Sequence, residues 1–313
     1  MLIGIKSMSL HGVEGYLVDV QVDVSSGMPT WEVVGLPDTS VRESKERVRA
    51  AIKNSGYYLA SRKIVINLAP AYTKKEGSFF DLPIAVGILN DIEVIKCSNI
   101  DEYLFIGELS LDGKLNKING ILPMCIEARN LGIKNVIIPY ENRLEAGIVE
   151  EINIIPAKDL VSVVSHLNGS QTIPNFTTSK DEILLSSNKS NVDFSEVKGQ
   201  KNVKRALEIA AAGGHNCLLI GSPGSGKTML SRRLPTILPD LTFEEALEIS
   251  KIHSIAGTLP SENSLINVRP FRAPHHTVSA TALTGGGRIP KPRRNKSRPS
   301  WSTFLRWTSR IKS

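Results

Sequence analysis

The segment Gly221–Thr228 constrains the fold of this chain more than any other feature. Its sequence, GSPGSGKT, fits the pattern G-x-x-x-x-G-K-[ST], and it lies between the apolar run CLLI and the run MLSRRL. Glycines let the backbone curl so that its amides face phosphate oxygens, while the lysine reaches the β- and γ-phosphates and the hydroxyl binds Mg²⁺. We therefore predict a strand, a phosphate-binding loop and a helix, with ATP and Mg²⁺ as cofactors. The predicted phosphate-binding residues are Gly221, Ser222, Pro223, Gly224, Ser225, Gly226, Lys227 and Thr228, and Thr228 is also the predicted Mg²⁺ ligand.

A phosphate-binding loop that hydrolyses ATP needs a second strand that ends in an acidic residue, which holds Mg²⁺ and positions water. Between Thr228 and the end of the chain, no run of four apolar residues leads into Asp or Glu. The nearest strand candidate, LINVRPF, carries no acid. We expect nucleotide binding with negligible hydrolysis.

Residues 1–166 alternate between strand-like and helix-like patterns, which predicts a mixed α/β domain. GYLVDVQVDV alternates in the strand manner, and Val41, Val48 and Ile52 recur at helical spacing in a segment with Asp38 or Thr39 as N-cap and Gly56 as stop. A hairpin is predicted around Asp112–Gly113. Further strands are predicted at 63–70, 135–139 and 152–157, and further helices at 79–91 and 124–133.

Two changes of composition divide the rest of the chain. Residues 167–192 are rich in Asn, Ser, Thr and Gln with little periodicity, which is typical of a linker. A second α/β unit over 193–292 begins with the helical run NVKRALEIAAAGGH, followed by the predicted strand NCLLIG. The last 21 residues, 293–313, form a separate tail.

The lead-in Val197-Lys198-Gly199-Gln200, the phosphate-binding loop and the segment RPFRAPHHTVSATALTGGGRIPKP together resemble the magnesium-chelatase-like AAA+ ATPases. The closer resemblance is to the ComM/YifB branch, associated with competence and DNA processing. Residues 1–166 resemble its accessory domain, most clearly in VGLPDTSVRESKERVRAAI, KKEGSFFDLPIA and FIGELSLDGKL. The resemblance implies a Lon protease/ribosomal-S5-like α+β domain followed by a partial P-loop AAA+ α/β domain.

A Lon-like fold also raises the hypothesis of a serine protease, in which a desolvated lysine activates a serine. Matching KKEGSFFDLP and INGILPMC to the family's catalytic segments places Phe79 at the serine position and Leu122 at the lysine position. Neither side chain exchanges a proton, and Ser78, one residue before Phe79, has no accompanying lysine. Proteolysis is therefore disfavoured, and a structural or partner-binding domain is expected.

The adjacent pair His275 and His276 does not by itself indicate a metal site, because neighbouring residues point to different sides and no further ligands are nearby. The resemblance instead implies an insertion in the AAA+ core that faces the ring centre or the substrate. Simple loop packing is the alternative. Arg272 is a candidate contact to a DNA phosphate.

The formal net charge of +7 comes entirely from the tail. Seven of the 38 basic residues lie in 293–313, where there is no acidic residue, and the other 31 balance the 31 acidic residues of the body. The charge is therefore no evidence that the body binds nucleic acid.

The resemblance implies that GGGRIPKP should continue with GEISLAH-x-GVLFLDE, which contains the missing acidic strand. The chain has RRNKSRPSWSTFLRW instead, and permitted codons for this segment, read one base later, encode the expected residues up to Asp. Trp301, which has a single codon, requires the expected Gly, whereas Trp307 forces Gly where the family has Glu. We interpret the tail as an out-of-frame product of a shift at Pro292–Arg293, which truncates the ATPase domain. The alternative is a basic arm whose Trp301, Phe304 and Trp307 stack on bases.

No apolar run approaches the ~20 residues that cross a bilayer, and the N-terminal residues show no export signal. We expect a cytoplasmic protein without membrane contact. The resemblance implies that the intact protein is a hexameric ring that couples ATP hydrolysis to work on DNA, such as branch migration. The alternative is the motor subunit of a magnesium chelatase.

Overall fold

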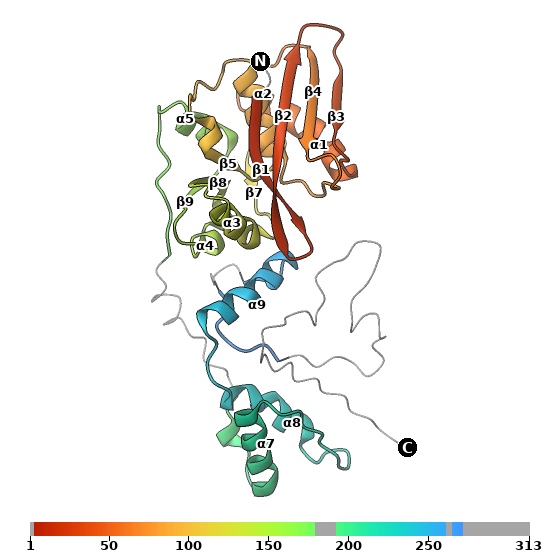
Figure 1. Ribbon diagram of the computed structural model, residues 1–313, viewed down its shortest axis with the longest axis vertical. Coiled ribbons are helices and arrows are strands. Elements are labelled where there is room, and N and C mark those ends of the chain that lie inside the picture. The colour runs from red at the N-terminus through yellow and green to blue at the C-terminus, as the bar shows by residue number, and fades with distance from the viewer. Residues whose placement is uncertain (1–2, 179–191, 261–264, 272–313) are drawn as a thin grey trace. The chain divides into compact units, whose positions relative to one another are not determined.

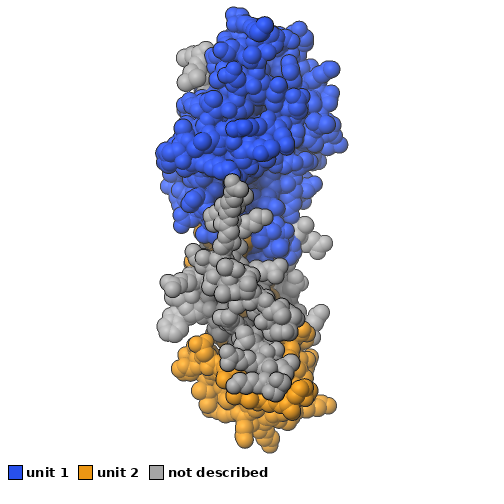
Figure 2. Space-filling model, turned by 90° about the vertical axis from the view of Figure 1, so that its right-hand side faces the viewer, with its two compact units in different colours: residues 1–180, 253–264 blue, residues 181–252, 265–313 orange. Residues whose placement is uncertain are grey.

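The computed structural model describes residues 3–178, 192–260 and 265–271, which form two compact units. Unit 1 contains the chain up to Lys180 together with 253–264, and unit 2 contains 181–252 and the chain from Leu265 onward (Figure 2). None of the helices in the described part of the chain has both the length and the apolar character needed to cross a membrane.

Unit 1 is built on a seven-stranded mixed sheet of order β3-β4-β2-β1-β5-β8-β9 (Figure 1). β1 pairs antiparallel with β2 and β2 with β4, while the pairs β3–β4, β1–β5, β5–β8 and β8–β9 are parallel. The strands of the large sheet are β1 (Ile3–His11), β2 (Glu14–Ser25), β3 (Trp31–Val34), β4 (Lys63–Ala69), β5 (Tyr103–Phe105), β8 (Asn135–Pro139) and β9 (Asn153–Ala157).

The helices of unit 1 supply the other half of its core. α2 is apolar on all sides, and its residues from Asp81 to Leu89 are all buried against the sheet and α1, as expected for a helix without a polar face. The helices of this part of unit 1 are α1 (Thr39–Asn54), α2 (Asp81–Asp91), α3 (Ile121–Asn130), α4 (Arg143–Ala146) and α5 (Leu160–Leu167), with 3₁₀ turns η1 (Ile100–Glu102) and η2 (Tyr140–Asn142).

Three local predictions for unit 1 are confirmed. Asp38 is the N-cap of α1, and its carboxylate accepts a hydrogen bond of 2.8 Å from the Val41 amide. The predicted hairpin is formed by β6 (Glu108–Leu109) and β7 (Leu115–Asn116), which pair antiparallel on either side of Asp112–Gly113. The alternating pattern of residues 15–24 is β2, whose Val18, Val20 and Val22 face the core.

The helices and 3₁₀ turns are the only regular elements in the described residues of unit 2. Unit 2 contains η3 (Phe194–Glu196), α7 (Lys201–Gly213), α8 (Lys227–Arg233) and η4 (Leu234–Ile237), and α9 (Phe243–Ile255) begins in it. Its small core joins η3, α7, α8 and η4, through buried Phe194, Val197, Leu207, Leu230 and Leu234.

The predicted strand NCLLIG is wrong. Residues 215–222 form no strand, and the side chains of Leu218 and Ile220 are 77% and 87% exposed. The reason is that a strand is held by main-chain hydrogen bonds to neighbouring strands, and the described part of unit 2 offers none to pair with. An apolar run therefore does not become a strand by itself.

The start of the predicted linker also differs from expectation. α5 ends at Leu167, but residues 172–178 return along β9, where Phe176 and Ile154 form an antiparallel bridge. Unit 1 accordingly extends past the predicted boundary at 166.

Candidate nucleotide-binding site

The predicted phosphate-binding loop has the backbone that its glycines allow. Gly224 and Gly226 have φ of 81° and 84°, a region that side-chain-bearing residues disfavour, and Gly226 is the N-cap from which α8 begins. The Ser225 amide donates to the Ser222 carbonyl at 3.3 Å, and the Leu230 amide donates to the Gly226 carbonyl at 3.0 Å. The loop thus leads directly into the first turn of a helix, where the backbone amides have no helical acceptors.

Lys227 lies folded back over the loop. Its ammonium donates to the carbonyls of Gly221 and Ser222 at 2.8 and 2.7 Å and to the Ser225 hydroxyl at 3.1 Å. The ammonium of Lys227 thus has only neutral oxygen acceptors in the loop. A phosphate that enters the loop would offer this ammonium a charged and therefore stronger acceptor. The loop and its lysine therefore form one candidate anion-binding group.

The helix after the loop is fixed to the rest of unit 2 by packing and by one ion pair. Leu230 and Leu234 are buried against Phe194 and Val197. Arg233, in the last turn of α8, donates to the Glu196 carboxylate of η3 at 2.6 Å. The residues just before α7 are thereby joined to the helix that follows the loop.

This loop fits the phosphates of a nucleotide. Lys227 and the first-turn amides of α8 would contact the phosphates, and Thr228, which is exposed, would offer its hydroxyl to the Mg²⁺ that accompanies them. Within residues 3–178, 192–260 and 265–271, no three His, Cys, Asp or Glu side chains gather as a metal-binding group.

In unit 1, the structure places Phe79 and Leu122 inside the domain. Phe79 packs on the core with its ring 4.8 Å from that of Phe80, and Leu122 is fully buried. The Leu122 amide donates at 3.2 Å to the buried carboxylate of Glu145, whose pKa is raised by burial. The Ser78 hydroxyl donates to the Glu108 carboxylate. Glu108 is therefore the ionisable partner that the structure gives Ser78, and no lysine of the described chain hydrogen-bonds to the Ser78 hydroxyl.

A buried ion pair that sequence patterns did not single out lies close to these residues. Arg47 of α1 donates to both carboxylate oxygens of Asp81, at 2.7 and 3.0 Å, and Asp81 is fully buried at the start of α2. Asp81 also accepts from the Leu109 amide of β6 at 3.3 Å. Burial raises the pKa of Asp81 to about 6, although Arg47 opposes the shift. The pair connects α1, α2 and the hairpin. The sequence signal that could have indicated it is the acidic residue Asp81 directly before the apolar run LPIAVGIL of α2.

Three predicted substrate-facing residues, Arg272, His275 and His276, lie outside the described residues, as does the tail 293–313. Their roles stay predictions. A cavity of about 500 Å³ lies in unit 2 between α7 and the end of η4, and no residue of the phosphate-binding loop lines it.

Comparison with known proteins assigns similarity to both units. Residues 20–142 match a family described as subunit ChlI of Mg-chelatase, and residues 193–295 match a family described as magnesium chelatase, subunit ChlI. The chain is 41% identical over 291 residues to Competence protein ComM of Haemophilus influenzae, which covers 92% of this chain and 56% of that protein. It is 44% identical over 283 residues to the uncharacterized protein YifB of Escherichia coli, covering 90% of this chain and 54% of YifB.

A more distant similarity concerns part of the chain. Lon protease 2 of Bacillus subtilis is 27% identical over 183 residues, which is 52% of this chain and 32% of that protein. The chain spans about half the length of the ComM and YifB relatives that it matches.

Proposed function

The chain belongs to the ComM/YifB-type family of magnesium-chelatase-like proteins, and on that basis we propose that it binds ATP with Mg²⁺ at the Gly221–Thr228 loop. The observation that carries this proposal is Lys227, which lies inside the loop with its ammonium on the carbonyls of Gly221 and Ser222. The base and sugar would extend beyond the loop, and the phosphates would replace these carbonyls as partners of the ammonium.

Titration of the chain with a fluorescent ATP analogue and Mg²⁺ tests the proposal. Lys227→Ala removes the cation and should weaken binding by a factor on the order of 100, about 3 kcal/mol, in line with loss of a charged hydrogen-bonding partner. Lys201→Ala is the control, because Lys201 is an exposed lysine of unit 2 outside the loop. Equal affinities for the two variants would exclude the loop as the nucleotide site.

For the intact family member we propose a ring-forming ATP-driven motor that acts on DNA, with six subunits in the ring. The support is the similarity to Competence protein ComM over 92% of this chain. The test is an ATPase assay on a protein with a repaired reading frame, with and without branched DNA. The proposal predicts stimulation by DNA, and the absence of stimulation by any branched substrate would count against it.

We further propose that the 313-residue chain itself hydrolyses ATP negligibly. The support is the lack, between Thr228 and Ser313, of an apolar run that leads into Asp or Glu. Measurable turnover that is lost in Lys227→Ala would contradict this proposal.

The out-of-frame origin of residues 293–313 is a separate proposal. The match to the magnesium-chelatase family model stops at residue 295, close to Pro292–Arg293. Sequencing the gene across this codon decides the question. A second frame without a VLFLD-like segment would exclude a frame shift and favour the basic arm.

A second candidate is a motor subunit of a metal chelatase, which the names of both matching families favour. The two candidates differ in the substrate on which ATP hydrolysis does work, which is DNA for the first and a tetrapyrrole for the second. In the same assay, a tetrapyrrole with its metal and the other chelatase subunits would replace DNA, and stimulation by that mixture alone would favour the chelatase.

A further inference from the structure

The chain segment Thr172–Thr178, here called the strap, lies against the edge strand β9 of the large sheet. The Phe176 amide donates to the Ile154 carbonyl at 2.8 Å, and the Thr178 amide donates to the Gly147 carbonyl at 3.0 Å. At its other end the Ile173 amide donates to Nδ1 of His166 at 3.0 Å. The strap therefore covers the open edge of β9, which would otherwise present unpaired main-chain groups.

Phe176 is the anchor of the strap. Its ring contacts Gly147, where an added Cβ would lie 2.8 Å from Cδ1 of Phe176. On another side the Arg143 guanidinium lies 5.9 Å from the centre of the ring, and the same guanidinium stacks on Tyr140 at 3.9 Å. Gly147 has a φ of −64°, which any residue can adopt, so its backbone does not require glycine. The lack of a side chain at Gly147 instead makes room for the ring of Phe176.

The strap is held more weakly than the strands beside it. β9 forms five registered pairs with β8, whereas the strap forms a single bridge with β9. None of the strap residues is fully buried, and the Thr178 hydroxyl oxygen is buried with no hydrogen-bond partner among the described residues. Segments with few buried apolar contacts open at a lower free energy than the core to which they attach.

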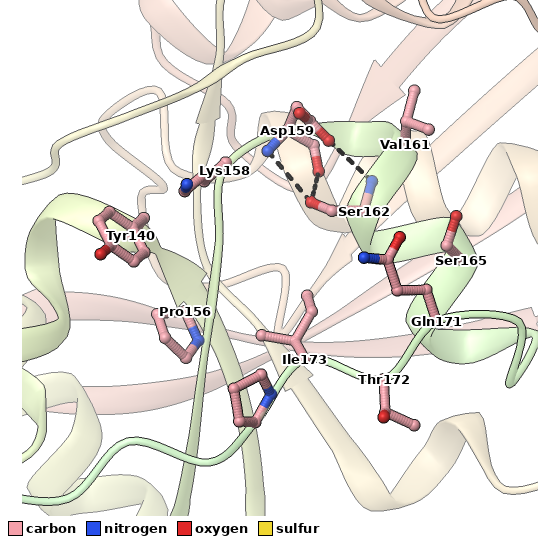
Figure 3. A pocket seen from close by; sticks show the side chains of 11 residues that line it. Tyr140, Pro156, Lys158, Asp159, Val161, Ser162, Ser165, Gln171, Thr172 and Ile173 are labelled. Carbon is pink, nitrogen blue, oxygen red and sulfur yellow. Dashed lines mark hydrogen bonds between the residues drawn. The ribbon is translucent and has the colours of Figure 1, made fainter.

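A cavity of about 510 Å³ lies between the start of the strap and α5. Gln171, Thr172 and Ile173 line it on the strap side, and Val161, Ser162 and Lys158 line it on the side of α5 and β9 (Figure 3). In the first half of the strap, the partly buried Ile173 packs on the core of unit 1 beside this cavity. The strap is attached at one end by Ile173, through its amide on His166 and its side chain on the core, and at the other end by Phe176 and Thr178. Between them the Asn175 side-chain amide donates to the Asn153 side-chain oxygen of β9 at 3.2 Å.

We propose that Thr172–Thr178 is a releasable strap, which opens from β9 while the sheet of unit 1 stays folded. When released, it would expose the main-chain groups along the edge of β9 that it covers in the docked state. This inference does not depend on nucleotide binding.

Hydrogen exchange of the whole chain, read at single amides and normalised to intrinsic rates, tests the proposal. In the unmodified chain the amides of Phe176 and Thr178 should be protected, yet should exchange faster than those of β8 and β9. Phe176→Ala removes the anchor and Gly147→Ala fills its socket, so each should reduce strap protection by about tenfold or more. Protection of β8 and β9 should stay unchanged.

Thr177→Ala is the matched control, because Thr177 is an exposed strap residue beside the anchor, and it should leave protection unchanged. If Gly147→Ala unfolds the domain in a thermal scan, the exchange rates of the Phe176→Ala variant alone test the proposal. Two results would overturn the proposal. Strap amides that exchange at intrinsic rates in the unmodified chain would mean that it does not dock, and amides that open only together with β9 would mean that it is a permanent strand.

Discussion

At the residue scale, the most consequential contact of unit 1 is the ion pair between Arg47 and Asp81. Asp81 is fully buried, while the side chain of Arg47 keeps 23% of its exposure. An unpaired buried carboxylate is far less favourable than a paired one. The main effect of the pair on stability is therefore seen when it is broken, because the buried carboxylate of Asp81 is then left unpaired.

Arg47→Ala should lower the free energy of unfolding of unit 1 by about 2–3 kcal/mol at neutral pH, because Asp81 then stays buried without its partner. Burial raises the pKa of Asp81 to about 6 in the folded chain, above its ordinary value. The protonated form is thus favoured by folding, and the stability that this provides is present at low pH and lost as pH rises through about 6. The penalty of Arg47→Ala should therefore be largest above pH 6 and shrink below it.

Urea unfolding at neutral and at acidic pH, followed by the β-sheet signal in circular dichroism, measures this difference. Every strand in the described chain belongs to unit 1, so the signal reports on that unit. Arg49→Ala is the control, because Arg49 is an exposed arginine of the same helix. A penalty for Arg47→Ala that is equal at both pH values would contradict the assignment.

At the element scale, α1 depends on its first turn. The sequence allowed two N-caps, and the structure selects Asp38, which accepts from the Val41 amide. The main chain of Asp38 is also fixed from outside the helix, since its amide donates to the Lys75 carbonyl at 2.9 Å. The segments VGLPDTS and KKEGSFFDLP, distant in the chain, meet at this helix start.

Asp38→Ala should lower the free energy of unfolding of unit 1 by about 1 kcal/mol, the usual cost of losing an N-cap side chain. Thr39→Ala, one residue later and exposed, should cost less than half of that. The same urea titration gives both values. A larger loss for Thr39→Ala would mean that Thr39 is the cap in solution.

At the scale of the whole molecule, the two units differ greatly in their cores. Unit 1 buries the cluster that spans its sheet and helices, whereas the cluster described for unit 2 has five buried residues. Because stability grows with the apolar area that a unit buries, we expect two thermal transitions and the lower one for unit 2.

Calorimetry with and without ATP and Mg²⁺ tests this expectation. A ligand that binds one unit stabilises that unit alone, by about 2.7 kcal/mol when its concentration is 100 times Kd. The lower transition should therefore move upward, and Lys227→Ala should abolish the movement. One transition, or an equal upward movement of both, would show that the units unfold together.

Several features follow from the sequence because they depend on residues close together in the chain. The loop Gly221–Thr228, the Asp38 cap and the hairpin at Asp112–Gly113 are of this kind, since glycine conformation, capping and tight turns are local properties. Alternation along residues 15–24 indicates a strand for the same reason. The family resemblance added the fold of residues 1–166, which periodicity could not give.

Other features were decided only by the tertiary structure. Arg47 meets Asp81, 34 residues away, and Phe176 meets Gly147, and neither contact has a local pattern. The part of the predicted linker from Thr172 to Thr178 lies along β9 because β9 is at a sheet edge with main-chain groups to offer. The apolar run before the loop, in contrast, remained unpaired. A sequence pattern determines which segments are able to form strands, but hydrogen bonds between distant segments decide which of them do.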